Sequence, residues 1–282
     1  MADLTGQLIV VTGANSGVGF SLSRMLLDAG AHVIMVCRSR ERGEKALEAL
    51  GGSPRPGRAE LEIADISDPG SVRDLATRLQ RFDGIAALVN NAGVWRNSLE
   101  RTAGGFEVTM ATNHLGHFLL TRLLMDQLAS GGNRIVNVSS EAHRSGKLAR
   151  APLRDVMTGA AWKGGLQAYS DSKQANVMFT SELVRRFGDE GLIANSVHPG
   201  VLATRIWNKN PGPLTLFMRL FKLIMKSPDV GGRAVLRLLS DPDLADVTNT
   251  YFKVEDASPA QPTALDADLA RDLWELSERL TE

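Results

Sequence analysis

The chain has 282 residues, of which 43% are hydrophobic, enough for a sizeable core, so disordered and fibrous proteins are excluded. The 32 Lys and Arg residues balance the 32 Asp and Glu residues, and without an excess of positive charge we expect no nucleic-acid partner. A single cysteine, Cys37, excludes an internal disulfide and is compatible with a reducing compartment. The N-terminal residues do not resemble a signal peptide, and no stretch approaches 18 uncharged apolar residues, so we expect a cytoplasmic protein without a transmembrane segment.

Residues 8–19 predict a strand, a glycine turn and the start of a helix. Residues 8–11 are apolar and partly β-branched, and after the turn a helical pattern passes through Leu22, Leu26 and Leu27. Glycines at such a turn let the backbone approach a pyrophosphate, whose charge is met by the amides of the helix N-terminus. We therefore predict a dinucleotide site. The predicted contacts here are Gly13, Asn15, Ser16, Gly17, Val18 and Gly19.

The end of the next predicted strand, residues 32–37, indicates which nicotinamide cofactor binds. An NAD site carries Asp or Glu here to bind the ribose hydroxyls, whereas this chain has Cys37 followed by Arg38. A guanidinium group binds phosphate with a fork of donors, so Arg38 favours the 2′-phosphate of NADP(H). The alternative is that the arginines of residues 38–42 are solvated charges at the start of a helix.

Strands and helices continue to alternate along the chain. Residues 61–64 and 85–89 are predicted as two further buried strands, with a helix between them. This alternation predicts an α/β protein with a parallel sheet, helices on both faces and ligands at the carboxyl ends of the strands. No repeat divides the chain, so we expect one domain over residues 1–282. The residues that follow these two strands include Asp65, Ile66, Asn91, Ala92 and Gly93.

A long helix is predicted over residues 105–128, with two polar side chains, Asn113 and His117, on its apolar stripe. A buried amide needs hydrogen-bond partners, so Asn113 either is satisfied structurally or belongs to a site. We favour the site for Asn113. For His117 we favour a satisfied core histidine.

Residues 134–138 are the fifth predicted strand, and Ser140 follows its carboxyl end, where a hydroxyl can donate to a substrate oxygen. The segment between Ser140 and Tyr169 is long, rich in Gly, Arg and Ala, and contains Trp162. Loops of that length are usually functional or disordered.

Tyr169 and Lys173 are four residues apart, which places their side chains on one face of the helix predicted there. A nearby cation favours the ionised form of a phenol, so we expect Lys173 to lower the pKa of Tyr169 and make it a better proton donor. Taken alone, the pair also fits a surface tyrosine and a solvated lysine on an amphipathic helix.

The sixth predicted strand, residues 193–197, is followed by Pro199-Gly200 and then by an amphipathic segment at residues 211–226. This segment is basic on one side and strongly apolar on the other. Three interpretations remain open: a lid over an apolar substrate, spanning about 205–228; a face that rests on a membrane surface; and an ordinary core helix. A last strand near residues 250–254 and a helix through the leucines at 265–280 are predicted to close the chain.

Taken together, the ordered motifs resemble the short-chain dehydrogenase/reductase superfamily over nearly the whole chain. They are Thr12-Gly13-x-x-x-Gly17-x-Gly19, Asn90-Asn91-Ala92-Gly93, Asn113, Ser140, Tyr169-x-x-x-Lys173 and Pro199-Gly200. Four longer stretches look like its retinol-dehydrogenase-like branch. They are Val36-Cys37-Arg38, Asn113-His114-Leu115-Gly116-His117-Phe118, the run from Tyr169 to Asn176, and Val197-His198-Pro199-Gly200.

The resemblance implies a single-domain Rossmann-like doubly wound fold with a seven-stranded parallel sheet flanked by helices. By this resemblance, Tyr169 is the proton donor or acceptor and Ser140 positions the carbonyl. Lys173 would bind the nicotinamide ribose and tune Tyr169, and Asn113 would support a proton relay. Asp65 would contact adenine. Further implied cofactor contacts are Ile66, Asn91, Ala92, Gly93, Tyr169, Lys173, Pro199, Gly200, Val201 and Thr204.

The predicted function is that of an NADP(H)-dependent oxidoreductase that interconverts an apolar aldehyde or ketone and its alcohol. Two alternatives remain open: a nucleotide-sensing protein with little catalysis, and an epimerase or dehydratase on the same fold. The expected partner is a small lipophilic carbonyl compound or alcohol, with no metal. The family often pairs through its long central helices, which suggests a homo-oligomer. The chain lacks the N-terminal membrane segment of many animal retinol dehydrogenases, so membrane anchoring is not carried over.

Overall fold

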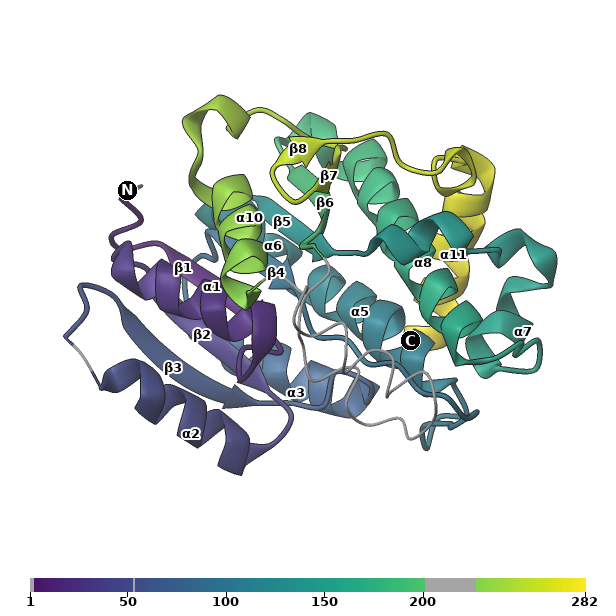
Figure 1. Ribbon diagram of the computed structural model, residues 1–282, viewed down its shortest axis with the longest axis horizontal. Coiled ribbons are helices and arrows are strands. Elements are labelled where there is room, and N and C mark those ends of the chain that lie inside the picture. The colour runs from purple at the N-terminus through teal and green to yellow at the C-terminus, as the bar shows by residue number, and fades with distance from the viewer. Residues whose placement is uncertain (1–2, 53, 201–226) are drawn as a thin grey trace.

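The computed structural model describes residues 3–52, 54–200 and 227–282. These residues form one central eight-stranded sheet with helices packed on it (Figure 1). The strand order is β3-β2-β1-β4-β5-β6-β7-β8, and every neighbouring pair from β3 to β7 is parallel. This confirms the predicted doubly wound α/β fold and adds a short eighth strand that pairs antiparallel with β7. The strands are β1 (Leu8–Thr12), β2 (His32–Cys37), β3 (Arg58–Ile63), β4 (Ala87–Asn90), β5 (Arg134–Val138), β6 (Ile193–His198), β7 (Tyr251–Lys253) and β8 (Asp256–Ala257).

Helices cover both faces of the sheet because side chains of the central strands alternate between two apolar clusters. In β1, Ile9 and Val11 face one cluster, whereas Leu8 and Val10 face the other. The first face is covered by α1 (Gly17–Asp28), α2 (Arg40–Gly51) and α10 (Pro228–Ser240). The second is covered by α3 (Pro69–Leu79), α5 (Gly116–Leu123), α6 (Met125–Gly131) and α8 (Gly165–Phe187). The helix α10 was not predicted from the sequence.

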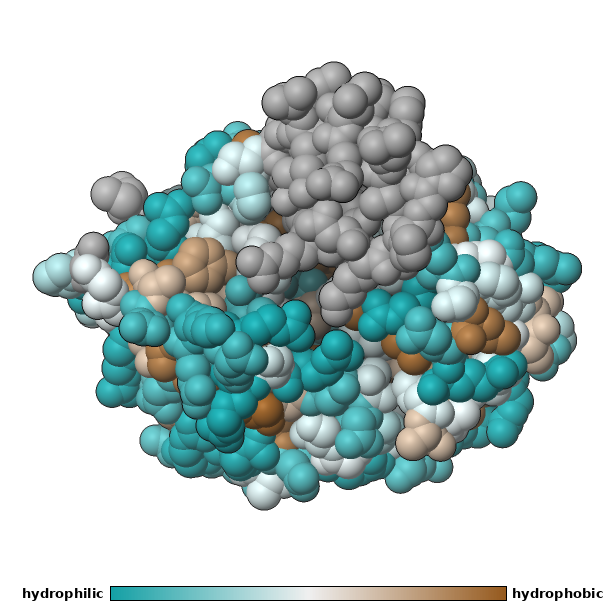
Figure 2. Space-filling view, turned by 60° about the horizontal axis from the view of Figure 1, so that its bottom comes forward, coloured by the Kyte–Doolittle hydropathy of each residue, from teal (hydrophilic) through white to brown (hydrophobic). Residues whose placement is uncertain are grey.

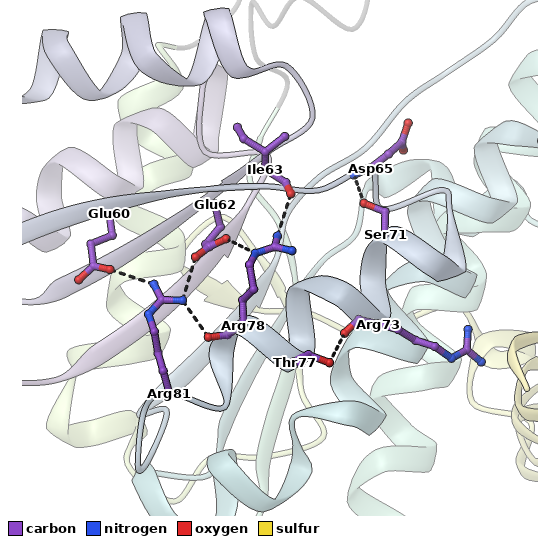
Figure 3. A network of polar contacts seen from close by, with 9 residues as sticks. All are labelled: Glu60, Glu62, Ile63, Asp65, Ser71, Arg73, Thr77, Arg78 and Arg81. Atoms are coloured by element: carbon purple, nitrogen blue, oxygen red, sulfur yellow. Dashed lines mark hydrogen bonds and ion pairs between the residues drawn. The ribbon is translucent and has the colours of Figure 1, made fainter.

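The strand predicted at residues 61–64 is present as β3, but it forms one edge of the sheet, so the prediction that it is buried was wrong. Its residues are exposed or only partly buried. Glu60 and Glu62 form ion pairs with Arg81 at 2.9 Å each, and Glu62 also pairs with Arg78 at 2.7 Å (Figure 3). The Arg78 guanidinium donates in addition to the main-chain oxygen of Ile63 at 2.9 Å. Charged side chains therefore line this edge, and β8 forms the other.

The predicted helix over residues 105–128 is divided into several elements. A short helix α4 (Val108–Met110) is followed by a π-helical turn over Ala111–Leu115, then by α5 and α6. Glu107 caps the start, because its Oε2 accepts from the Met110 amide at 2.8 Å. Gly116, which follows the π-turn, is needed because a Cβ there would collide with the main-chain oxygen of Ile66. Asn113 therefore lies in a widened turn, a feature often found at functional sites.

The segment between Ser140 and Tyr169 is ordered and anchored on α8. It contains two 3₁₀ turns and the helix α7 (Leu153–Thr158). Two side chains of α8 accept from main-chain amides of this segment: Asp171 Oδ1 from Lys147 at 2.8 Å, and Gln174 Oε1 from Leu148 at 3.1 Å.

The terminal helix α11 (Ala267–Thr281) begins after Asp266, whose Oδ1 accepts from the Leu269 amide at 3.0 Å. Leu265, predicted to share the helical register, precedes it and is 51% exposed. The helix packs against α5 and α8, with the Trp274 ring 4.9 Å from the Phe118 ring of α5 and 5.8 Å from the Phe179 ring of α8. None of the helices in the described ranges is long and apolar enough to cross a membrane.

Several sequence predictions lie outside the described residues. They concern Val201, Thr204 and the amphipathic segment at 211–226. Of the predicted lid at about 205–228, only Ser227 and Pro228 are described: Ser227 caps α10 and Pro228 is its first residue.

Candidate active site

The predicted site residues converge at the carboxyl edge of the sheet. The glycine turn follows β1 and the Asn91 segment follows β4, on either side of the point where the strand order reverses. This is where open α/β sheets bind ligands. Asp65 follows β3, Ser140 follows β5, and Pro199-Gly200 follows β6.

The glycine turn fits closely against the segment after β4. Gly13 has φ 68°, and a Cβ there would lie 2.9 Å from the Ala92 Cα. A Cβ on Gly19 would lie 2.6 Å from the Gly13 main-chain oxygen. The amide of Asn91 holds the two segments together, because its Nδ2 donates to the Thr12 main-chain oxygen at 2.7 Å. The glycines therefore make a backbone cradle that larger residues would fill.

The cradle ends at the N-terminus of α1, a 12-residue helix. The Ser16 side chain makes no capping hydrogen bond, and no acidic residue lies in the first turn. The first amides and the positive end of the helix dipole therefore suit an anion. A dinucleotide pyrophosphate fits this donor set.

Arg38 lies beside Asp65, with Nη1 3.9 Å from Oδ2 and nearly half of its side chain exposed. Asp65 uses its other oxygen, Oδ1, to accept from the amide and hydroxyl of Ser67 at 2.9 and 2.7 Å. Burial raises the pKa of the Cys37 thiol to about 11, so this neighbour of Arg38 is neutral. Arg40, in contrast, is a solvated helix charge that pairs with Glu44.

Lys173 is a buried lysine on α8. Its Nζ donates to the main-chain oxygen of Val138 at 2.8 Å and lies 5.7 Å from the centre of the Tyr169 ring. No carboxylate among the described residues forms an ion pair with it. Burial lowers the pKa of Lys173 to about 7. The lysine is therefore close to its midpoint at neutral pH.

Tyr169 is protonated over the whole neutral range. Burial raises the pKa of its phenol to about 12, and a hydrogen bond with the Ser140 hydroxyl opposes the rise. The expectation that the pKa of Tyr169 is lowered is therefore wrong for the protein without bound cofactor. Desolvation of the phenol is the larger cause, and burial also disfavours the charged form of Lys173.

The Ser140 hydroxyl faces Tyr169 and is held by the 3₁₀ turn that follows. Its Oγ accepts from the Ala142 amide at 3.2 Å. The main-chain oxygen of Ser140 lies 2.7 Å from Nδ1 of the buried His143. The other ring nitrogen of His143 accepts from the Gln261 amide at 3.1 Å. His143 was not singled out in the sequence, although its place three residues after the strand-end serine is a signal.

The side chain of Asn113 is fully satisfied, yet it lies within the site. Oδ1 accepts from the Val94 amide at 2.8 Å, and Nδ2 donates to the Val94 oxygen and to Ser172 Oγ at 3.0 and 2.9 Å. A Cβ on Gly93 would lie 3.6 Å from Asn113 Oδ1 and 3.8 Å from Lys173 Nζ. The amide therefore fixes residues 93–94 against the helix face that carries Lys173. Both interpretations of Asn113 are compatible with this placement.

His117 is a satisfied core histidine, as predicted. It is buried, with Nε2 2.9 Å from Thr12 Oγ1 and Nδ1 3.2 Å from the Asn113 main-chain oxygen.

Trp95 is a site neighbour that the sequence did not reveal. Its ring centre lies 6.3 Å from that of Tyr169. Gly165, the first residue of α8, permits this approach, because a Cβ there would collide with the Arg96 oxygen and lie 2.8 Å from Trp95 Nε1. Its place in the sequence could have indicated this role, because Trp95 lies two residues after the Asn90-Asn91-Ala92-Gly93 motif.

Figure 2 shows that hydrophilic side chains cover much of the described surface on this face, with small hydrophobic patches between them. No group of three or more His, Cys, Asp or Glu side chains in the described ranges could hold a metal ion.

Comparisons with known proteins agree with this arrangement. The family model described as short chain dehydrogenase matches residues 7–152. Human retinol dehydrogenase 13 is 35% identical over 288 residues, covering 99% of this chain and 86% of that protein. A crystal structure of an uncharacterised Mycobacterium paratuberculosis protein is 34% identical with a TM-score of 0.78, covering 100% of this chain and 95% of that one. A Burkholderia cenocepacia short chain dehydrogenase in complex with NADP is 26% identical with a TM-score of 0.68, covering 89% and 96%.

Proposed function

The chain belongs to the short-chain dehydrogenase family and is retinol-dehydrogenase-like, and we propose that it is an NADP(H)-dependent oxidoreductase that interconverts an apolar aldehyde or ketone and its alcohol. The bound dinucleotide would supply or accept the hydride. One observation supports the proposal above the others: the Tyr169 phenol and Ser140 hydroxyl face each other beside the buried Lys173.

In the reducing direction, Tyr169 would give its proton to the substrate oxygen. A pKa of about 12 keeps this proton in place at neutral pH, so the donor form is fully populated. Ser140 would donate to the same oxygen and orient the carbonyl. In the oxidising direction the phenol must lose its proton, and a protonated Lys173 beside its ring would favour the phenolate.

The glycine turn and α1 would bind the pyrophosphate, as their open amides suggest. Arg38 would bind the 2′-phosphate of NADP(H) by exchanging its loose contact with Asp65 for a charged hydrogen bond. The NADP complex of the Burkholderia relative is consistent with this preference. Asp65 and Ile66 would lie at the adenine, residues 91–93 at the ribose side, and Pro199-Gly200 at the nicotinamide.

An apolar substrate is suggested by Trp95 beside the reacting tyrosine and by the names of the retinol dehydrogenase relatives. The lid or membrane-surface role of residues 211–226 stays a prediction. So do the single domain, the cytoplasmic location and the homo-oligomer.

The test is to replace Tyr169 with Phe and to follow NADPH oxidation with aldehydes of increasing chain length. We expect turnover to fall by about 100-fold or more, the usual contribution of a general acid. The matched control is Tyr251→Phe, because Tyr251 is the other of the two tyrosines and its phenol donates to Glu141 at 2.7 Å. Undiminished turnover in Tyr169→Phe would refute the assignment.

Two other results would redirect the proposal. NADPH binding without turnover across a broad panel of carbonyls and alcohols would indicate a nucleotide-sensing protein. A product isomeric with its substrate, formed without net change in the cofactor, would indicate an epimerase.

A further inference from the structure

His117 lies at the centre of a hydrogen-bond chain that joins three parts of the site. Its Nε2 contacts Thr12 Oγ1 at the end of β1, and its Nδ1 contacts the Asn113 main-chain oxygen in the π-turn. Thr12 Oγ1 also accepts from the amides of Asn91 and Ala92, both at 2.9 Å, at the end of β4. One imidazole therefore connects the nucleotide-binding turn to the helix that carries Asn113.

The partners of His117 fix its protonation state. The Asn113 carbonyl can only accept, so Nδ1 must carry a proton. The lone pairs of the Thr12 hydroxyl are taken by two amides, so its own proton goes to Nε2 at 2.9 Å rather than to the Val89 oxygen at 3.3 Å. With a neutral His117 ring that carries its proton on Nδ1, every donor in this chain of hydrogen bonds therefore faces an acceptor. Burial lowers the pKa of His117 to about 4; the hydrogen bond with the Asn113 carbonyl opposes this effect, and the charge of Lys173 lowers the pKa by a smaller amount.

A movement of Asn113 would also displace the segments that position Tyr169 and Lys173. Its side chain holds the main chain of Val94 on one side and Ser172 on the other, and the Ser172 hydroxyl donates to the main-chain oxygen of Tyr169 at 2.7 Å. A π-turn is a rare, widened form of helix, so its geometry needs support from outside the helix. His117 supplies that support from the side of the nucleotide-binding turn.

We propose that His117 is a positioning residue: in its neutral form with the proton on Nδ1, it holds Asn113 in a fixed relation to the nucleotide-binding turn, and through Asn113 it positions Tyr169 and Lys173. This inference rests on the proposed oxidoreductase function and deepens it. It separates His117 from the other buried histidine of the region. The side chain of His114 instead contacts Ser277 of α11 at 2.8 Å.

The first test reads the tautomer and is independent of activity. Nitrogen-15 spectra of the protein with labelled histidine are recorded between about pH 5.5 and 8.5, with His117→Gln used to assign the signal. We expect a neutral ring with the proton on Nδ1 at every pH. A proton on Nε2, or a titration within this range, would overturn the inference.

The second test separates positioning from packing. His117→Leu and His114→Leu each remove one buried imidazole from the same helical region, and both are assayed with NADPH and octanal. For His117→Leu we expect kcat to fall about tenfold or more while the KM for NADPH changes little, since misplacement of reacting groups affects the chemical step. His114→Leu should lower the melting temperature similarly and leave kcat nearly unchanged. His117→Gln, which keeps one donor and one acceptor, should recover part of kcat.

The outcomes distinguish the two proposals. If the wild type turns over substrate and His117→Leu matches His114→Leu in kcat, the positioning role is wrong and the oxidoreductase function stands. If the wild type shows no turnover with any carbonyl, the function is wrong, and the tautomer measurement still decides whether His117 holds the chain of hydrogen bonds. If His117→Leu does not fold, His117→Gln and the spectra of the wild type give the decision.

Discussion

The carboxylate of Asp171 and the guanidinium of Arg150 form an ion pair in which the carboxylate is fully buried. Asp171 is fully buried and also accepts from the Lys147 amide and from Gln167 at 2.8 and 2.9 Å. Arg150 donates in turn to the oxygens of Lys147 and Ala161 at 3.0 and 3.2 Å. Because Asp171 lies between Tyr169 and Lys173 in the chain, this pair ties the segment before α8 to the helix that bears both candidate catalytic residues.

Removal of Arg150 should strongly destabilise the fold. In Arg150→Met the Asp171 charge stays buried without its partner, which costs about 3–5 kcal/mol in comparable pairs. Urea unfolding at neutral pH measures the loss. Arg271→Met breaks the exposed pair with Asp268 and should cost less than about 1 kcal/mol. Equal losses in the two variants would contradict the structural role of the buried pair.

Lys173 should make stability rise with pH between pH 7 and 9. Burial lowers its pKa from 10.5 to about 7, so over this window the unfolded chain binds more protons than the folded one. Stability then increases with pH, and Lys173→Met should remove this part of the slope. Above pH 9 the effect is opposed by Cys37, whose raised pKa keeps its proton in the folded state. Urea unfolding of both proteins at pH 7 and 9 gives the slopes, and identical slopes would contradict the prediction.

Arg38→Ala should weaken NADPH binding by about ten- to 100-fold, because a hydrogen bond to a charged group contributes about 1.5–3 kcal/mol. NADH binding should change little, since it lacks the 2′-phosphate. The matched control is Arg40→Ala, which removes a neighbouring, largely exposed arginine paired with Glu44. Fluorescence titration measures all affinities. If NADH binds the wild type as tightly as NADPH, the phosphate-binding role of Arg38 is wrong.

The helix α11 should prevent pairing through the outer faces of α5 and α8. Trp274 of α11 is buried against Phe118 of α5 and Phe179 of α8, with the guanidinium groups of Arg122 and Arg186 5.4 and 4.7 Å from its ring. We therefore expect that any homo-oligomer uses another surface. Trp274→Ala should cost about 3–5 kcal/mol and expose this apolar face. Light scattering combined with cross-linking tests the prediction, and a native dimer cross-linked through α8 would contradict it.

Local sequence patterns predicted the parts of the fold whose causes are local. The β1 strand, the glycine turn and α1 are adjacent in the chain, so apolar spacing and glycines sufficed. The strand at β3 was predicted but its burial was not, because the range 61–64 left out most of the alternation of Ala59, Leu61 and Ile63 with charged residues that marks a half-exposed strand. The π-turn was missed because its insertion leaves the apolar register of Met110, Leu120 and Leu124 almost continuous, and these side chains are indeed buried.

The candidate site was predictable as a set of residues but not as a set of interactions. Tyr169 and Lys173 share a helix face by spacing alone, whereas the pKa of Tyr169 depends on how far the surrounding chain excludes water. Contacts between distant segments, such as His143 with Gln261 or His117 with Thr12, have no local signal. The resemblance to a family supplied roles for single residues, but it did not indicate what holds them in place.

The two edges of the sheet also bear on how the protein behaves at high concentration. An exposed strand edge can be extended by a strand from another molecule, which is a common route to aggregation. Here a second strand laid along β3 would have to displace Arg78 from the Ile63 oxygen and approach the charges of Glu60, Glu62 and Arg81. At the opposite edge the two residues of β8 offer too short a template for stable strand addition. Self-association by strand addition is therefore disfavoured at both edges. Replacing both Glu60 and Arg81 with valine should make the protein prone to it.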